Sequence, residues 1–254
     1  MQSSRSRSSL QQEALARIER EGNAYIIGVD ETGYGSLAGP VFVGAAVVRA
    51  GWKDSRVRDS KQLDHQQRQR AIRDALVPPN LAFSIVLGHT SQDIDKMGVH
   101  HARDDLVKQV VLRCRAHYPH ALVVMDGNEL PFKIDNMVCL PKADVLVTAV
   151  SAASILAKED RDACMKELHK LWPMYGFAKH NGYGTGQHNS ALARYGPCPI
   201  HRFSYRNIQE VVAKFGYKVG SPPKPSQTKG QPARISGWRP LPSGMRVSTS
   251  SNKR

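Results

Sequence analysis

An apolar run that ends abruptly in two carboxylates constrains the fold of this chain more than any other feature. The β-branched stretch at residues 26–29 is followed by Asp30 and Glu31, and then by a glycine-rich turn over residues 33–39. Because an ionised carboxylate is costly inside a strand, we expect the strand to end at these acids and the backbone to bend there. Taken alone, the pattern predicts only a strand that ends in a polar turn.

A second stretch of the chain repeats this pattern. Residues 121–125 are apolar and lead directly into Asp126 and Gly127. If the two strands are neighbours in one sheet, their ends gather three carboxylates, which repel one another unless a cation lies between them. The hypothesis of a shared site therefore requires that these two strands lie side by side.

A further acid, Asp144, begins a long helical pattern, where it could equally serve as a helix N-cap. Together with Asp30, Glu31 and Asp126 it forms a set of carboxylates at element ends, where functional residues are common. Oxygen ligands without Cys or His partners suit magnesium or manganese better than zinc. Two such ions roughly 4 Å apart can activate a water and stabilise the leaving oxygen of a phosphodiester.

The charge of the chain points to a polyanionic partner. The net charge is +14, and nucleic acid is the first candidate for such a basic protein. Beyond Glu210 the chain has no acidic residue and nine basic ones, which leaves +5 for the remainder. Basic charge and clustered acids together predict metal-dependent cleavage or transfer on a nucleic-acid backbone.

The cysteines and the apolar segments indicate the compartment. Cys114, Cys139, Cys164 and Cys198 lack the spacing of a zinc site, so we expect reduced thiols. No apolar run has the length of a membrane span, and the N-terminal residues lack the hydrophobic segment of a secretory signal. We therefore expect a cytoplasmic protein that contacts no membrane, with a monomer as the default state.

Periodicity predicts an α/β protein with a mixed sheet and helices packed on it. Predicted strands cover residues 25–30, 41–48, 81–87, 121–125 and 137–140. Predicted helices cover residues 10–21, a stretch ending near 76, 93–97, 99–118, 144–171, 190–195 and 204–215. We expect residues 1–9 to be disordered and the Pro/Ser/Gly-rich segment beyond Gly220 to be a flexible tail.

Several motifs in a fixed order resemble type 2 ribonuclease H (ribonuclease HII). They span roughly residues 22–210, and in combination they are highly specific, although each alone would be weak. The matching segments are residues 30–40, 59–63 (Asp-Ser-Lys-Gln-Leu), Asp126, 142–144 (Lys-Ala-Asp), 152–158, Arg161-Asp162, 182–185 (Gly-Tyr-Gly-Thr), His188 and His201-Arg202.

The resemblance implies a ribonuclease H-like mixed β-sheet flanked by helices, with a helical C-terminal extension and a disordered basic tail. The implied divisions are an N-terminal extension (1–21), a catalytic domain (22–215) and the tail (216–254). The implied activity is endonucleolytic hydrolysis of the RNA strand of RNA–DNA hybrids, including nicking 5′ to a single ribonucleotide in duplex DNA. Such cleavage leaves a 3′-hydroxyl and a 5′-phosphate.

The resemblance also assigns roles to individual residues. Catalysis and the binding of two Mn²⁺ or Mg²⁺ ions are implied for the four acids Asp30, Glu31, Asp126 and Asp144. Substrate binding is implied for Gly33, Tyr34, Gly35, Ser60, Lys61 and Tyr183. The tight glycine turn would bring backbone groups to the 2′-hydroxyl, Ser60 and Lys61 would hold phosphate, and Tyr183 would stack on the next sugar.

Two positions depart from the family pattern, and other interpretations stay open. The family usually has Arg at position 34 and Lys at position 181, where this chain has Tyr34 and Asn181. A hybrid-binding protein with low turnover, or another nuclease of this fold that acts on DNA, are the alternatives. For Ser154, packing of the helix is as good an interpretation as a functional role. For Lys158, an exposed charge is likewise as good an interpretation as a functional role. His188 and His201 are expected to be hydrogen-bonding residues of loops rather than catalytic bases.

Overall fold

The computed structural model describes residues 24–216, and its centre is a mixed sheet of five strands in the order β3-β2-β1-β4-β5. The strands are β1 (Tyr25–Thr32), β2 (Val41–Arg49), β3 (Leu81–His89), β4 (Leu122–Asp126) and β5 (Met137–Leu140). The first three strands pair antiparallel, whereas β4 runs parallel to β1 and β5 runs parallel to β4. The predicted mixed sheet is confirmed, and so is each predicted strand. The expected end of the first strand at Asp30 and Glu31 is wrong, because pairing with β2 continues β1 through both acids to Thr32.

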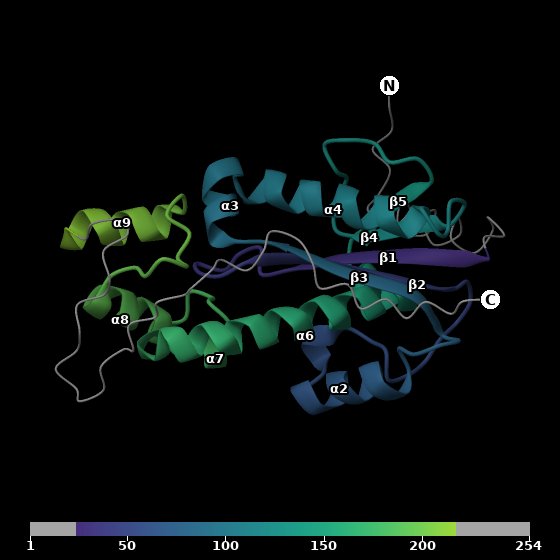
Figure 1. Cartoon of the computed structure of the whole chain (residues 1–254), viewed down its shortest axis with the longest axis horizontal. Coiled ribbons are helices and arrows are strands. Elements are labelled where there is room, and N and C mark those ends of the chain that lie inside the picture. Colours follow the sequence, from purple (N-terminus) through teal and green to yellow (C-terminus); the bar gives the residue numbers. More distant parts are fainter. Residues whose placement is uncertain (1–23, 217–254) are drawn as a thin grey trace, which may run out of the picture.

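Helices cover both faces of the sheet and extend beyond one end of it (Figure 1). They are α2 (His65–Asp74), α3 (Ser91–Met97), α4 (Val99–Arg115), α5 (Ala143–Leu146), α6 (Thr148–Leu171), α7 (Phe177–His180), α8 (Gly186–Tyr195) and α9 (Arg206–Phe215). Two short 3-10 helices, η1 (Ser60–Gln62) and η2 (Pro173–Tyr175), precede α2 and α7. No helix of residues 24–216 is long and apolar enough to cross a membrane.

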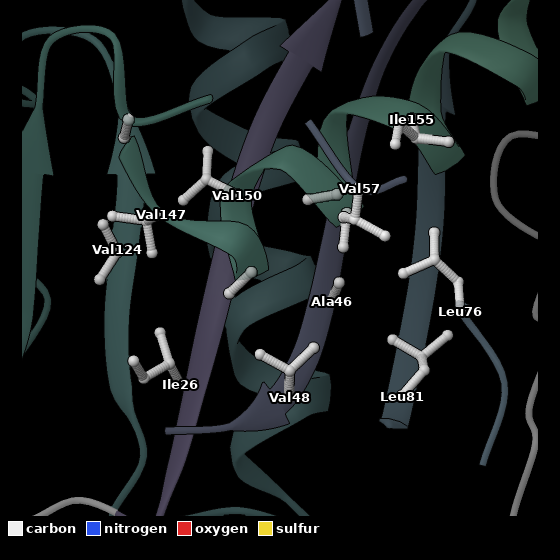
Figure 2. Close-up of a cluster of buried hydrophobic side chains, with 14 of the residues drawn as sticks. Ile26, Ala46, Val48, Val57, Leu76, Leu81, Val124, Val147, Val150 and Ile155 are labelled. Carbon is white, nitrogen blue, oxygen red and sulfur yellow. The ribbon is translucent and has the colours of Figure 1, made fainter. Parts of the chain in front are cut away.

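The alternation of side chains along β1 divides the core into two layers. Ile26 belongs to the layer under α6 and α2, together with Val124 of β4 and Ile155 of α6 (Figure 2). Ile27 and Val29 belong to the opposite layer, under α4. Because β1 is central and buried on both faces, its direction and register are fixed by both layers.

A glycine allows the long helix α6 to lie directly on β1. A Cβ atom at Gly28 would lie 2.0 Å from the backbone carbon of Ala149, so no side chain fits there. Gly44 on β2 faces the same helix, and its Cβ would lie 2.6 Å from the Ala153 carbonyl oxygen. The absence of side chains at these strand positions sets the spacing between the sheet and the helix.

A third apolar cluster joins the C-terminal helices to the turn after β1. It contains Leu37 from that turn, Phe177 from α7 and Ile208 from α9. Backbone hydrogen bonds add to this contact, from Leu37 N to the Gly182 carbonyl and from Gly39 N to the Ile200 carbonyl. The helical C-terminal extension implied by the resemblance is therefore present, and it supports the turn.

Some predicted boundaries differ from the structure. The helix predicted over 144–171 is two helices, because Val147 has extended backbone angles between α5 and α6. The helix predicted over 99–118 ends at Arg115. All four cysteines are free thiols, as expected. The helix predicted over 10–21 and the flexible tail lie outside the described residues.

Candidate active site

The parallel pairing of β1 with β4 brings the two acid-bearing strand ends together. Ile26 pairs with Leu122 and Val29 pairs with Met125, so Asp30 and Asp126 each follow the last residue that pairs between β1 and β4. The shared-site hypothesis required the strands that carry Asp30 and Asp126 to lie side by side, and the structure shows that they do. This placement is an outcome of the sheet order, since β1 has β2 on its other side.

The two acids of β1 point to opposite faces of the sheet, because successive side chains on a strand alternate. Asp30 is on the α6 side, where the Ser154 side chain hydrogen-bonds to its carboxylate. Glu31 is on the α4 side, where its largest favourable electrostatic partner is Arg103. The sheet end therefore presents one carboxylate to each helical layer.

The fourth acid, Asp144, is placed by a strained connection between β5 and α5. Lys142 has a φ of 66°, in the left-handed region that is unfavourable for a residue with a side chain. This conformation directs the Ala143 N–H to Asp126, with 2.7 Å between Ala143 N and Asp126 Oδ1. Asp144 lies in the first turn of α5 and is not its N-cap, so the capping interpretation is wrong.

Burial and repulsion between neighbouring acids raise the pKa values of Asp30, Glu31 and Asp126. The pKa of Asp30 lies well above its usual value, first because the group is buried and then because Glu31, Asp126 and Asp144 are nearby. Burial followed by repulsion from Asp144 also raises the pKa of Asp126. Burial raises the pKa of Glu31, although Arg103 opposes this change. The negative charge at this sheet end is thus only partly compensated by nearby cations.

Lys61 provides part of the missing positive charge. Its Nζ lies 3.1 Å from Asp144 Oδ2, and its side chain is otherwise exposed to solvent. The segment η1 that carries Lys61 is held by the buried Arg68, which donates to the carbonyls of Ser60 and Leu63. Arg68 is in turn paired with Glu159 of α6. A buried ion pair therefore fixes the loop from which Lys61 reaches the acids.

Ser60 lies beneath the surface, although phosphate binding was predicted for it. Its hydroxyl is buried and lies 2.8 Å from the Ser154 hydroxyl. Through Ser154 it is linked to Asp30. Lys158, the other residue with two interpretations, pairs with Asp162 at 2.5 Å on the same helix.

The donor set suits a hard divalent cation. The carboxylates supply oxygen atoms only. The raised pKa values of Asp30 and Asp126 reflect burial first and repulsion second, and a cation would relieve the repulsion. Within residues 24–216 no three His, Cys, Asp or Glu side chains are arranged around a common point as metal ligands. In this conformation Lys61 provides the countercharge on Asp144.

Two buried arginines hold the glycine turn beside the acids. Arg202 donates to the carbonyl oxygens of Gly33 at 2.6 Å and of Tyr34 at 2.7 Å. Arg161 donates to Ser36 Oγ at 2.8 Å and to the Asn181 carbonyl at 2.9 Å. Gly33 has a φ of 83°, and a Cβ atom there would lie 2.0 Å from Arg161 Nε. Glycine at position 33 is thus required both by its backbone and by the guanidinium beneath it.

Tyr183 is held next to this turn by a pair of buried histidines. The Cys198 N–H points at His201 Nδ1 at 2.8 Å, and the Cys198 carbonyl already accepts from the His201 backbone. His201 Nδ1 is therefore the acceptor, and its Nε2–H donates to His188 Nε2 at 3.0 Å. His188 Nδ1–H then donates to the Tyr183 carbonyl at 3.0 Å. Both histidines are hydrogen-bonding residues, as expected, although His188 lies in α8 and not in a loop.

Asn181 adopts a left-handed conformation with a φ of 49°. Asparagine tolerates this region better than most residues with a side chain. Its carbonyl is the one that accepts from Arg161, so the residue serves the turn through its backbone.

Arg103 carried no local signal in the sequence, whereas Arg161 and Arg202 lie in segments that match the family motifs, and Arg161 also has a periodic signal. Arg161 lies four residues after Ala157 and four residues before Met165, and both of these residues are buried. Arg161 therefore occupies the buried face of α6. A charged residue at such a position indicates a buried polar contact. Arg202 contacts Gly39, 163 positions away in the chain, and no periodicity could reveal this contact.

A family model described as ribonuclease HII matches residues 27–208 of this chain. The chain belongs to the ribonuclease HII family. The ribonuclease HII of Chlamydia caviae is 40% identical over 193 residues, which cover 76% of this chain and 89% of the relative. As a family member, the protein is a hydrolase with ribonuclease H endonuclease function.

Solved structures support the same fold. Ribonuclease H2 of Pyrococcus horikoshii superposes with a TM-score of 0.60 at 24% identity. The match covers 76% of this chain and 100% of the Pyrococcus horikoshii chain. Bst-RNase HIII, solved in complex with Mn²⁺, superposes with a TM-score of 0.56 at 19% identity. The match covers 78% of this chain and 72% of the Bst-RNase HIII chain. The predicted ribonuclease H-like architecture is confirmed.

Proposed function

We propose that this protein cleaves the RNA strand of hybrids and nicks 5′ to single ribonucleotides in duplex DNA, leaving a 3′-hydroxyl and a 5′-phosphate. The observation that carries the proposal is that β1, β4 and α5 bring four carboxylates to one end of the sheet, where the other three act electrostatically on Asp30, although no three of them surround a common point in this conformation. Their mutual repulsion is relieved by divalent cations, and their position beside the glycine turn gives access to a nucleic-acid strand.

The catalytic groups are Asp30, Glu31, Asp126 and Asp144, which would hold two ions, Mg²⁺ or Mn²⁺. When bound, such ions supply an activated water and stabilise the leaving oxygen. Ser154 hydrogen-bonds to Asp30 and so orients that carboxylate, while the Ala143 N–H orients Asp126. The Mn²⁺ complex of Bst-RNase HIII, a protein of the same fold, is consistent with an oxygen-rich site here.

The substrate-binding groups surround these acids. The turn Gly33, Tyr34 and Gly35 would sense the 2′-hydroxyl through backbone atoms, since arginines hold it rigidly from beneath. Lys61 is exposed and can approach a phosphate, and Ser60 supports it through the buried hydroxyl network. Tyr183 is 40% exposed, so its ring is available for stacking on a sugar.

We assign the catalytic domain to residues 22–215, between an N-terminal extension (1–21) and a basic tail (216–254). The tail carries positive charge without acids and would add salt-dependent attraction to nucleic acid. A monomer in the cytoplasm is the expected state. Sedimentation of the full chain with and without a hybrid duplex tests the oligomeric state.

The decisive experiment is a nicking assay on a DNA duplex that contains one ribonucleotide, with Mg²⁺ or Mn²⁺. We expect a single cut 5′ to the ribonucleotide and a product with a 3′-hydroxyl end. The Asp126→Asn variant keeps the shape of the side chain but removes a ligand charge, and it should lose at least ~100-fold in turnover, the cost of a lost electrostatic contact in a transition state.

Two other outcomes would change the assignment. Tight binding of the hybrid without any cut would favour a binding protein with low turnover. Cutting of an all-DNA duplex at the same rate would favour a different nuclease of this fold. An active Asp126→Asn enzyme would remove the acids from the proposed mechanism.

A further inference from the structure

The first turns of α4 form a cluster with the glycine turn. The Tyr34 hydroxyl lies 2.5 Å from His100 Nδ1, and the two rings meet edge to face. The guanidinium of Arg103 lies over the Tyr34 ring, 5.7 Å from its centroid. His100 and Arg103 are three residues apart, so both side chains lie on the helix face that meets Tyr34.

The direction of Arg103 is fixed by its neighbour on the helix. Arg103 Nε and Nη2 donate to Asp104 Oδ1 at 2.8 and 2.5 Å. A guanidinium has five N–H donors, so these two bonds leave donors for an anion. The Arg103 side chain is 21% exposed, which places the group at the surface but not free in solvent.

Arg103 also lies close to the acids. Among the charged groups near Glu31, Arg103 is the one that most strongly favours its ionised form. Lys61, carried by a different element, contacts Asp144. The acids are therefore flanked by one cation from η1 and one from α4.

We propose that Arg103 contacts substrate directly and binds the phosphate backbone of the nucleic-acid strand where it passes Tyr34. The proposal rests on the nuclease function given above and adds a specific residue to it. A strand that enters a site made of carboxylates is repelled unless cations lie beside its phosphates. Arg103 is pre-oriented by Asp104 and Tyr34, so little side-chain freedom is lost when it binds.

The test compares Arg103→Ala with Arg113→Ala, which removes the same charge about 15 Å further along α4. For Arg103→Ala we expect KM for the hybrid to rise about tenfold with little change in kcat, the pattern of lost ground-state binding. The slope of log KM against log salt should fall by about 0.7–0.9, the value for one phosphate contact. Arg113→Ala should match the wild type.

Two further measurements separate contact from mere structural support. Arg103→Lys keeps the charge but not the fork, so it should retain the salt slope and show an intermediate KM. Metal binding is measured by the rise in unfolding temperature as Mn²⁺ is added. The Mn²⁺ concentration that gives half of this rise should be equal to or lower than that of the wild type in Arg103→Ala, because a cation beside Glu31 has been removed. A loss of metal binding in parallel with KM would overturn the proposal.

The two possible failures are distinct. If the wild type nicks at the ribonucleotide but Arg103→Ala behaves like Arg113→Ala, the role of Arg103 is disproved and the nuclease function stands. If the wild type does not nick at all, both proposals fail.

Discussion

The side chains that define this site are costly to the fold. Asp30 is buried among other carboxylates, and the buried Arg161 and Arg202 bind carbonyl oxygens instead of acids. Burial lowers the pKa of Arg161 to about 10, which reflects the cost of placing a charge there. We infer that such groups are kept because they hold the proposed catalytic acids and the glycine turn in place.

Replacement of Asp30 should therefore make the metal-free protein more stable. Asp30→Asn removes one of the repelling charges and keeps an acceptor for Ser154, and we expect a gain on the order of 1 kcal/mol in the free energy of unfolding. The same change should abolish both activity and the stabilisation by Mg²⁺. Urea unfolding with and without Mg²⁺ measures this, with Asp135→Asn in an exposed loop as the matched control.

Tyr183 offers a second test at the residue scale. If its ring stacks on the sugar that follows a single ribonucleotide, Tyr183→Ala should reduce cleavage of that substrate about tenfold, comparable to one lost stacking contact. Long hybrids should be affected much less, and Tyr183→Phe should remain close to the wild type. Equal losses on both substrates would argue against the stacking role.

At the scale of elements, the site depends on how α6 lies on the sheet. The same helix packs on Gly28 through its backbone, supplies Ser154 to Asp30 and supplies Arg161 to the turn. A change in the distance between α6 and β1 should thus alter both stability and catalysis.

Gly28→Ala tests this dependence. The added Cβ would meet the backbone of Ala149 at 2.0 Å, and neither strand nor helix can move without disturbing the core. We expect a loss of about 3 kcal/mol in the free energy of unfolding, at the upper end for overpacking. Gly186→Ala is the control, since nothing lies within 4 Å of its Cβ position. A Gly28→Ala protein as stable as the control would contradict the close-contact argument.

At the scale of the whole molecule, the C-terminal helices are joined to the active site through the neutral pair His188 and His201. Burial lowers the pKa of His188 to about 4 and that of His201 to about 3. The unfolded chain binds protons at these histidines near pH 6.5, whereas the folded protein does not until much lower pH. Their contribution to stability is therefore present at neutral pH and decreases as the pH falls below about 6.5.

A glutamine at position 188 cannot bind this proton but can still donate to the Tyr183 carbonyl. The stability advantage of the wild type over His188→Gln should shrink by about 2 kcal/mol between pH 7 and pH 5. Taking the difference between the two proteins cancels the opposite contribution of the carboxyl groups with raised pKa values. Urea unfolding of both proteins at several pH values measures the difference in their free energies of unfolding. A difference that does not change with pH would mean that His188 is not held neutral.

Local sequence patterns determined the strands, most of the helices and the position of the four acids at element ends, because periodicity and turn chemistry act over a few residues. The tertiary structure decided which strand ends meet, through the parallel pairing of β1 with β4. It also decided that Arg103, Arg161 and Arg202 surround the glycine turn. These contacts join residues far apart in the chain, and only the packing of α4, α6 and the C-terminal helices on one sheet brings them together.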